Sequence, residues 1–113
     1  MGTLPGICDE SIRRHALLRI SRLFNVEAGS LPTDASFGKE LRPSFVSDFK
    51  VNEFDRLDND IKDVADREIL KELRSGVLTI RTVRDYCEHM VRCYRTRPDE
   101  VIHVLQITHV DQV

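Results

Sequence analysis

Apolar residues recur every three or four positions over several stretches of the chain, which is the pattern of helices that bury one face. A first helix is predicted from a cap at Asp9 to about Phe24. A second is predicted to open at Pro43 and Ser44, because proline presets φ and serine offers a capping oxygen. Its apolar stripe lies opposite a largely acidic face. The stripe consists of Val51, Phe54, Leu57 and Ile61.

Local stop and start signals define two further helices. Asp66 is expected to cap a short third helix that Gly76 ends. A fourth helix is expected to start at Thr82, which forms a capping box with Asp85 in place of the usual glutamate, and to end before Pro98. Residues 100–110 are rich in β-branched side chains, and periodicity alone leaves open a strand or a short helix packed back on the bundle.

These elements predict an all-α fold, a small four-helix bundle over residues 9–97 with a C-terminal extension over 98–113. A chain of 113 residues suits one core, and 41% hydrophobic with 32% charged residues is typical of a globular protein. No apolar run approaches the roughly 20 residues of a membrane span, and the N-terminus lacks a signal-peptide pattern, so we expect a cytoplasmic protein. The expected core is Phe24, Val26, Leu31, Phe37, Leu41, Val51, Phe54, Leu57, Ile61, Ile80, Val83 and Met90.

Charge is unevenly distributed although the net charge is only −2. Residues 48–72 are acidic and residues 73–99 are rich in arginine, which indicates either solvated helix faces or two docking surfaces of opposite sign. The cysteines and histidines show neither a disulfide framework nor zinc spacing, and no catalytic residue is predicted. A nucleic-acid site is disfavoured because no recognition motif accompanies the basic residues. Those residues are Arg81, Arg84, Arg92, Arg95 and Arg97.

Three segments resemble acyl carrier proteins in order and spacing. Residues 24–41, with Ala35-Ser36-Phe37 and Glu40-Leu41, resemble the loop between the first two helices of that family. The stripe from Val51 to Ile61 resembles its second helix, and residues 78–86 resemble the entry to its last helix. Together the similar segments span about residues 12–92.

The resemblance implies a specialised acyl carrier protein of fatty acid or lipid biosynthesis, which is not itself an enzyme. In that family a phosphopantetheinyl transferase attaches 4′-phosphopantetheine covalently to a serine, and the arm then holds acyl groups as thioesters. An apolar slot between helices shelters the chain. Acyl-processing enzymes with basic surfaces bind the acidic second helix. Here the matching acids are Asp48, Asp55, Asp58 and Asp60.

The attachment residue is predicted to be Ser47, with Ser44 as the alternative. The family's Asp-Ser-Leu triplet is absent, and Asp48 stands where the family has an apolar residue. Counting back four residues from Val51 selects Ser47, whereas counting forward from Leu41 reaches a phenylalanine two residues earlier. A second hypothesis is therefore an unmodified carrier-like domain used for protein interaction.

Overall fold

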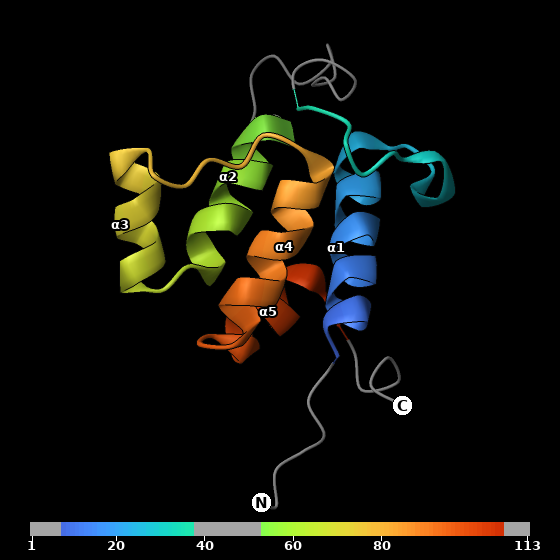
Figure 1. The fold of residues 1–113 in the computed structure, drawn as a ribbon. Helices are drawn as coiled ribbons and strands as arrows, with labels where there is room; N and C mark the ends of the chain where they lie inside the picture. The colour runs from blue at the N-terminus through green and yellow to red at the C-terminus, as the bar shows by residue number, and fades with distance from the viewer. Residues whose placement is uncertain (1–7, 38–52, 108–113) are drawn as a thin grey trace, which may run out of the picture.

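The structure is a computed structural model that describes residues 8–37 and 53–107. Within these ranges the chain forms five α-helices and a short 3-10 helix without any strand, which confirms the predicted all-α class (Figure 1). No helix in these ranges has the length and apolar character needed to cross a membrane. The elements are α1 (Asp9–Phe24), η1 (Ala28–Ser30), α2 (Glu53–Val64), α3 (Arg67–Ser75), α4 (Val83–Tyr94) and α5 (Pro98–Leu105).

One hydrophobic core joins α1, α2, α4 and α5, with α1 and α4 lying side by side (Figure 1). Ile12 and Ile20 of α1 and Met90 of α4 are each 0% exposed. Within α1 and within α4 the buried residues recur at helical spacing, so each helix turns one apolar stripe inward. Full burial of each aliphatic side chain contributes roughly 1.5–3 kcal/mol. α3 adds only Ile69 to the fully buried set.

The predicted core is confirmed in its centre and differs at its rim. Leu57, Ile61, Val83 and Met90 are buried, whereas Val26 is 40% exposed and does not belong to the core. Five of the expected members, from helix ends and loops, are only half-buried against it: Phe24, Leu31, Phe37, Phe54 and Ile80. The Phe24 ring stacks on Phe37 at 6.1 Å and meets Phe54 edge-on at 6.0 Å. Leu41 and Val51 lie outside the described residues.

The predicted ends of α3 and the predicted start of α4 are confirmed, whereas the predicted start of the second helix at Pro43 and Ser44 lies outside the described residues. The Asp66 carboxylate accepts a hydrogen bond from the Ile69 amide, and Gly76 ends α3 with φ +83°. Thr82 and Asp85 form the expected capping box of α4. The first helix differs, because its N-cap is Cys8 and Asp9 lies in its first turn. A carboxylate in the first turn still interacts favourably with the helix dipole.

The segment after residue 97 resolves the open choice between strand and helix. α5 begins with Pro98 in its first turn, where a proline lacks an amide hydrogen that the helix does not need. Val101, Val104 and Leu105 recur at helical spacing and are buried against α1, α2 and α4. α5 is therefore a full contributor to the core.

Candidate functional site

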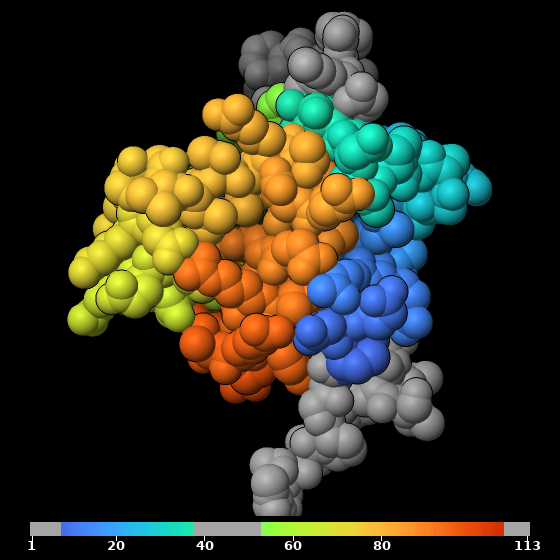
Figure 2. All heavy atoms as spheres, viewed as in Figure 1, coloured from blue at the N-terminus to red at the C-terminus, as the bar shows by residue number. Residues whose placement is uncertain are grey.

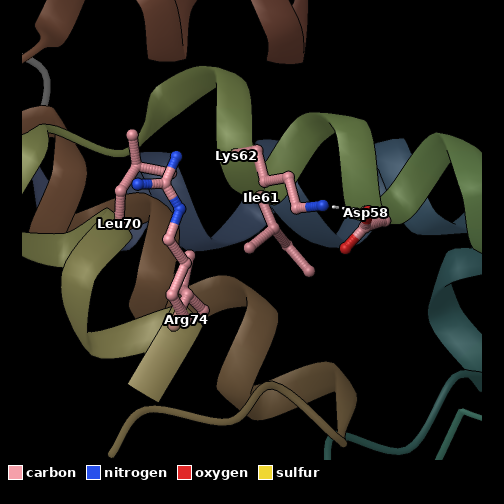
Figure 3. A pocket seen from close by; sticks show the side chains of 6 residues that line it. Asp58, Ile61, Lys62, Leu70 and Arg74 are labelled. Carbon is pink, nitrogen blue, oxygen red and sulfur yellow. Dashed lines mark ion pairs between the residues drawn. The ribbon is translucent and has the colours of Figure 1, made fainter. Parts of the chain in front are cut away.

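An open groove separates α2 from α3. It encloses about 410 Å³. Its floor is apolar, with Ile61 from α2 and Leu70 and Leu73 from α3, while Lys62 and Arg74 stand at its rim (Figure 3). α3 lies at one edge of the molecule (Figure 2), so the groove that it lines with α2 lies beside the core. An apolar floor with a few charged groups around it is typical of a site for an apolar ligand.

α3 is attached to the bundle through the buried Ile69, through two half-buried leucines that pack against the core, and through one ion pair. Ile69 is 3% exposed, whereas Leu70 and Leu73 remain half-buried. The Arg92 guanidinium of α4 donates two hydrogen bonds, of 2.8 and 2.7 Å, to the Glu72 carboxylate. These bonds hold the pKa of Glu72 below its ordinary value. The remaining apolar surface of α3 faces the groove.

Where α2 packs against α1 and α4, it forms a buried polar junction with them. The Asp60 carboxylate is 5% exposed. It accepts hydrogen bonds of 2.9 and 3.1 Å from the Arg19 guanidinium and one of 2.8 Å from the Tyr86 hydroxyl. Burial, followed by the nearby Asp60 charge, raises the pKa of Tyr86 well above its ordinary value, so this hydroxyl stays a donor. Three helices meet at this one carboxylate.

Asp60 must therefore be removed from the predicted partner-binding surface. The sequence analysis placed it with Asp55 and Asp58 on one acidic face, but only those two are exposed. A signal was present, since Leu57, Asp60 and Ile61 are spaced as one buried helical face. An acid at such a position requires a partner, because an unpaired charge is too costly to bury.

The exposed acidic face of α2 is narrower than predicted. Asp55 and Asp58 alternate with two cations, Arg56 and Lys62, and the Lys62 ammonium lies 2.9 Å from the Asp58 carboxylate. Asp48, the fourth predicted member, lies outside the described residues. Attraction of a basic partner by this face would consequently depend on few charges.

The predicted attachment residues, Ser47 and Ser44, both lie outside the described residues. The loop that precedes them is anchored to the start of α4. The Phe37 amide donates to the Arg81 carbonyl at 2.9 Å, and the Val83 amide donates to the Ala35 carbonyl at 3.0 Å. Ser36 and Thr82 form an isolated bridge between the same segments. These contacts hold residues 33–37 against the start of α4.

Buried histidine and cysteine side chains serve packing. Nε2 of His89 lies 2.8 Å from the Ile61 carbonyl, and burial lowers the pKa of His89, which favours a neutral ring that donates this bond. Burial raises the pKa of both Cys87 and Cys93 to about 12, so their thiols stay protonated and unreactive. Within the described ranges, no group of three side chains is arranged to hold a metal ion.

Most of the arginines considered for nucleic-acid binding are engaged within the protein. Arg92 pairs with Glu72 at 2.7 Å, Arg95 with Asp9 at 3.5 Å, and Arg97 with Glu100 at 3.3 Å. Each cation already has an acidic neighbour. A continuous positive surface along α4 is therefore not formed by these residues.

Comparison with known proteins identifies no relative. No family model matches the chain, and no curated protein or solved structure is significantly similar to it. The function is therefore inferred from the geometry of the groove and from the sequence pattern.

Proposed function

We propose that the protein is a specialised acyl carrier, which presents an acyl thioester on a 4′-phosphopantetheine arm attached to Ser47. The observation that carries this proposal is the apolar groove between α2 and α3, formed by Ile61, Leu70 and Leu73. An acyl chain could bury its methylene groups on this apolar floor, and each buried methylene contributes about 0.8 kcal/mol. The domain performs no chemistry of its own and delivers the thioester to partner enzymes.

The order of the helices supports the same proposal. A long first helix, a structured loop, an amphipathic second helix, a short third and a capped fourth follow one another as in the carrier-type bundle that the sequence resembles. In this arrangement α5 is an addition that packs on the core. The Lys62–Asp58 pair, 2.9 Å apart, stands at the groove mouth (Figure 3), where a change of side-chain rotamer would widen the entrance.

The first test is the intact mass of the full chain after co-expression with a broad phosphopantetheinyl transferase. We expect the mass gain of one arm, lost in Ser47→Ala and retained in Ser44→Ala. Both variants should keep the helical circular-dichroism spectrum, which separates a lost site from a lost fold. A gain that persists in Ser47→Ala but not in Ser44→Ala moves the site, and absence of any gain rejects the carrier function.

A second test asks whether the groove holds the chain. Loading the arm with an octanoyl group should raise the melting temperature, since a ligand bound to the folded state stabilises it. Leu73→Gln should remove most of this gain because it places an amide on the groove floor. Leu17→Gln is the matched control, a half-buried leucine outside the groove, and should retain the gain.

An unmodified protein-interaction module is the second candidate. It is favoured by the absent Asp-Ser-Leu triplet and by the narrow acidic face of α2, where Asp60 is buried. In this case the α2–α3 groove would receive an apolar side chain of a partner protein. The intact-mass experiment distinguishes the two candidates, because the module gains no mass with any transferase.

A further inference from the structure

A second hollow, which we call the basic hollow, adjoins the groove at the corner where α2 ends and α5 begins. It encloses about 640 Å³. Four cations line it, Arg67, Lys71 and Arg74 from α3 together with Arg97, which precedes α5. Leu70 supplies an apolar surface between them. The corner lies at the C-terminal end of α2.

Three of the four cations of the basic hollow are weakly neutralised, whereas Arg97 is already paired with Glu100 at 3.3 Å. Arg67 and Arg74 form no ion pair with any residue in the described part of the chain. The Lys71 ammonium lies 4.0 Å from Glu68, and both side chains are well exposed, so water screens the pair. A surface with several cations and few neutralising carboxylates attracts anions.

The single carboxylate that lines the basic hollow is already committed to α3. Asp66 accepts the Ile69 amide at 2.9 Å as the helix cap. This bond, with a further one from the Thr96 side chain, lowers the pKa of Asp66. Asp66 thus stays ionised, and it is the one carboxylate beside four cations, so the charged groups that line the basic hollow are predominantly cationic.

Two structural features orient these cations. A guanidinium nitrogen of Arg97 donates to the Ala65 carbonyl at 3.1 Å, which fixes this half-buried side chain. On α3, positions 67, 71 and 74 are spaced by four and three residues, so their side chains share one face of the helix. One fixed cation thus lies beside a row of three adjustable ones.

We propose that the basic hollow binds a small molecule that carries two or more linked phosphate groups. Guanidinium groups match phosphate oxygens in two-point hydrogen bonds, and the lysine adds a mobile ammonium. A single phosphate cannot engage four cations spread along α3 and across to Arg97, whereas a linked phosphate chain can. The volume falls within the range of small-molecule sites. This proposal is independent of the carrier function.

The test is a calorimetric titration of the full-length protein with inorganic tripolyphosphate, pyrophosphate, ADP and inorganic phosphate. We expect tripolyphosphate to bind at least about tenfold more tightly than phosphate, and its affinity to fall as salt rises. ADP binding more tightly than pyrophosphate assigns a nucleotide, and equal affinities assign the phosphates alone. Both results support the proposal, whereas equal affinity for tripolyphosphate and phosphate overturns it.

A double variant locates the site. Arg67→Gln with Arg74→Gln should weaken tripolyphosphate binding by about tenfold or more. Arg14→Gln with Arg56→Gln is the matched control, since both are exposed arginines outside the basic hollow and the net charge changes equally. The control should bind within about twofold of the wild type. An equal loss in both double variants shows general charge attraction and overturns the proposal, as does the absence of binding.

Discussion

Helix α2 has two different surroundings, one where it packs against α1 and α4 and one where it faces α3. On one side Asp60 is enclosed between α1 and α4, where Arg19 and Tyr86 satisfy it. Toward α3 the same helix borders an open groove, which Ile61 lines together with the half-buried Leu70 and Leu73. The first side places a charge in the interior and the second leaves apolar surface accessible. A charged residue of α2 is therefore buried while apolar residues beside this helix stay accessible, which is the reverse of the usual pattern.

The contacts that stabilise the fold and the surface that can bind a ligand therefore lie on different parts of α2. The polar junction joins three helices at one carboxylate, so it specifies how α1, α2 and α4 meet. The groove side is held by the ion pair between Arg92 and Glu72 and by Ile69. α3 can therefore adjust to a ligand without disturbing the core.

Replacing Asp60 should have the largest effect. Asp60→Ala leaves the buried Tyr86 hydroxyl and the Arg19 guanidinium without their partner, and should cost about 3–5 kcal/mol. Asp58→Ala, the matched control, removes an exposed acid and should cost about 0–1 kcal/mol. Urea unfolding of both variants measures the difference. Equal costs would show that the junction is solvated and contributes no more than a surface pair.

This contrast also shows where sequence reasoning succeeded. The caps at Asp66 and Thr82 were predicted correctly because a cap depends on residues three positions apart. Asp60 was misplaced because its partners come from α1 and α4, 41 and 26 residues away. In the amino-acid composition, Asp60 is only one of many acidic residues. Only its position in the buried stripe distinguished it from Asp58.

The apolar surfaces were predicted unequally for a related reason. Periodicity identifies which face of a helix is apolar, but it does not show how closely another helix covers that face. Leu57 and Leu70 both fit such stripes, and only Leu57 is fully buried. The groove arises because α3 meets the core through Ile69 alone among its buried residues. How closely α3 approaches α2 is set by tertiary packing, which the local sequence pattern does not reveal.

Leucine truncation should separate the two sides by a smaller amount. Leu57→Ala creates a cavity in the core and should cost about 2–5 kcal/mol. Leu73→Ala removes a half-buried side chain from the groove, where water can fill the space, and should cost about 1 kcal/mol. Urea unfolding again gives both values. Similar costs would mean that the groove is closed in solution.

Mild acid should first loosen the contact between α4 and α2 at His89, whose ring lies 2.8 Å from the Ile61 carbonyl. Burial places the pKa of His89 below its ordinary 6.5, so the unfolded chain binds a proton more readily than the folded one. Its contribution to stability is present above pH 6.5 and is lost as the pH falls below that value. Thermal unfolding between pH 7 and pH 5 should show this decline, with a weaker slope in His89→Gln. An unchanged slope in the variant would assign the decline to other groups.

The groove side responds to acid in a different window. Hydrogen bonds lower the pKa of Asp66 and Glu72 below their ordinary values, so these carboxylates support α3 until the pH falls toward those lowered values. Amide exchange of α3 at pH 5 should therefore match that at pH 7 after correction for the intrinsic rate. Faster exchange confined to α3 at pH 5 would contradict the separation of the two sides.

The end of α3 provides the smallest and most local test. Gly76 ends the helix at φ +83°, a conformation that costs a residue with a Cβ about 1 kcal/mol. A Cβ there meets no atom within 4 Å, so Gly76→Ala tests backbone strain alone. Gly29→Ala is the matched control, with equal space and no positive φ, and should be neutral or slightly stabilising. Melting temperatures should fall in the first variant and hold or rise in the second. If Gly76→Ala leaves the melting temperature unchanged while exchange at the end of α3 accelerates, α3 opens independently of the core, as its single buried contact at Ile69 implies.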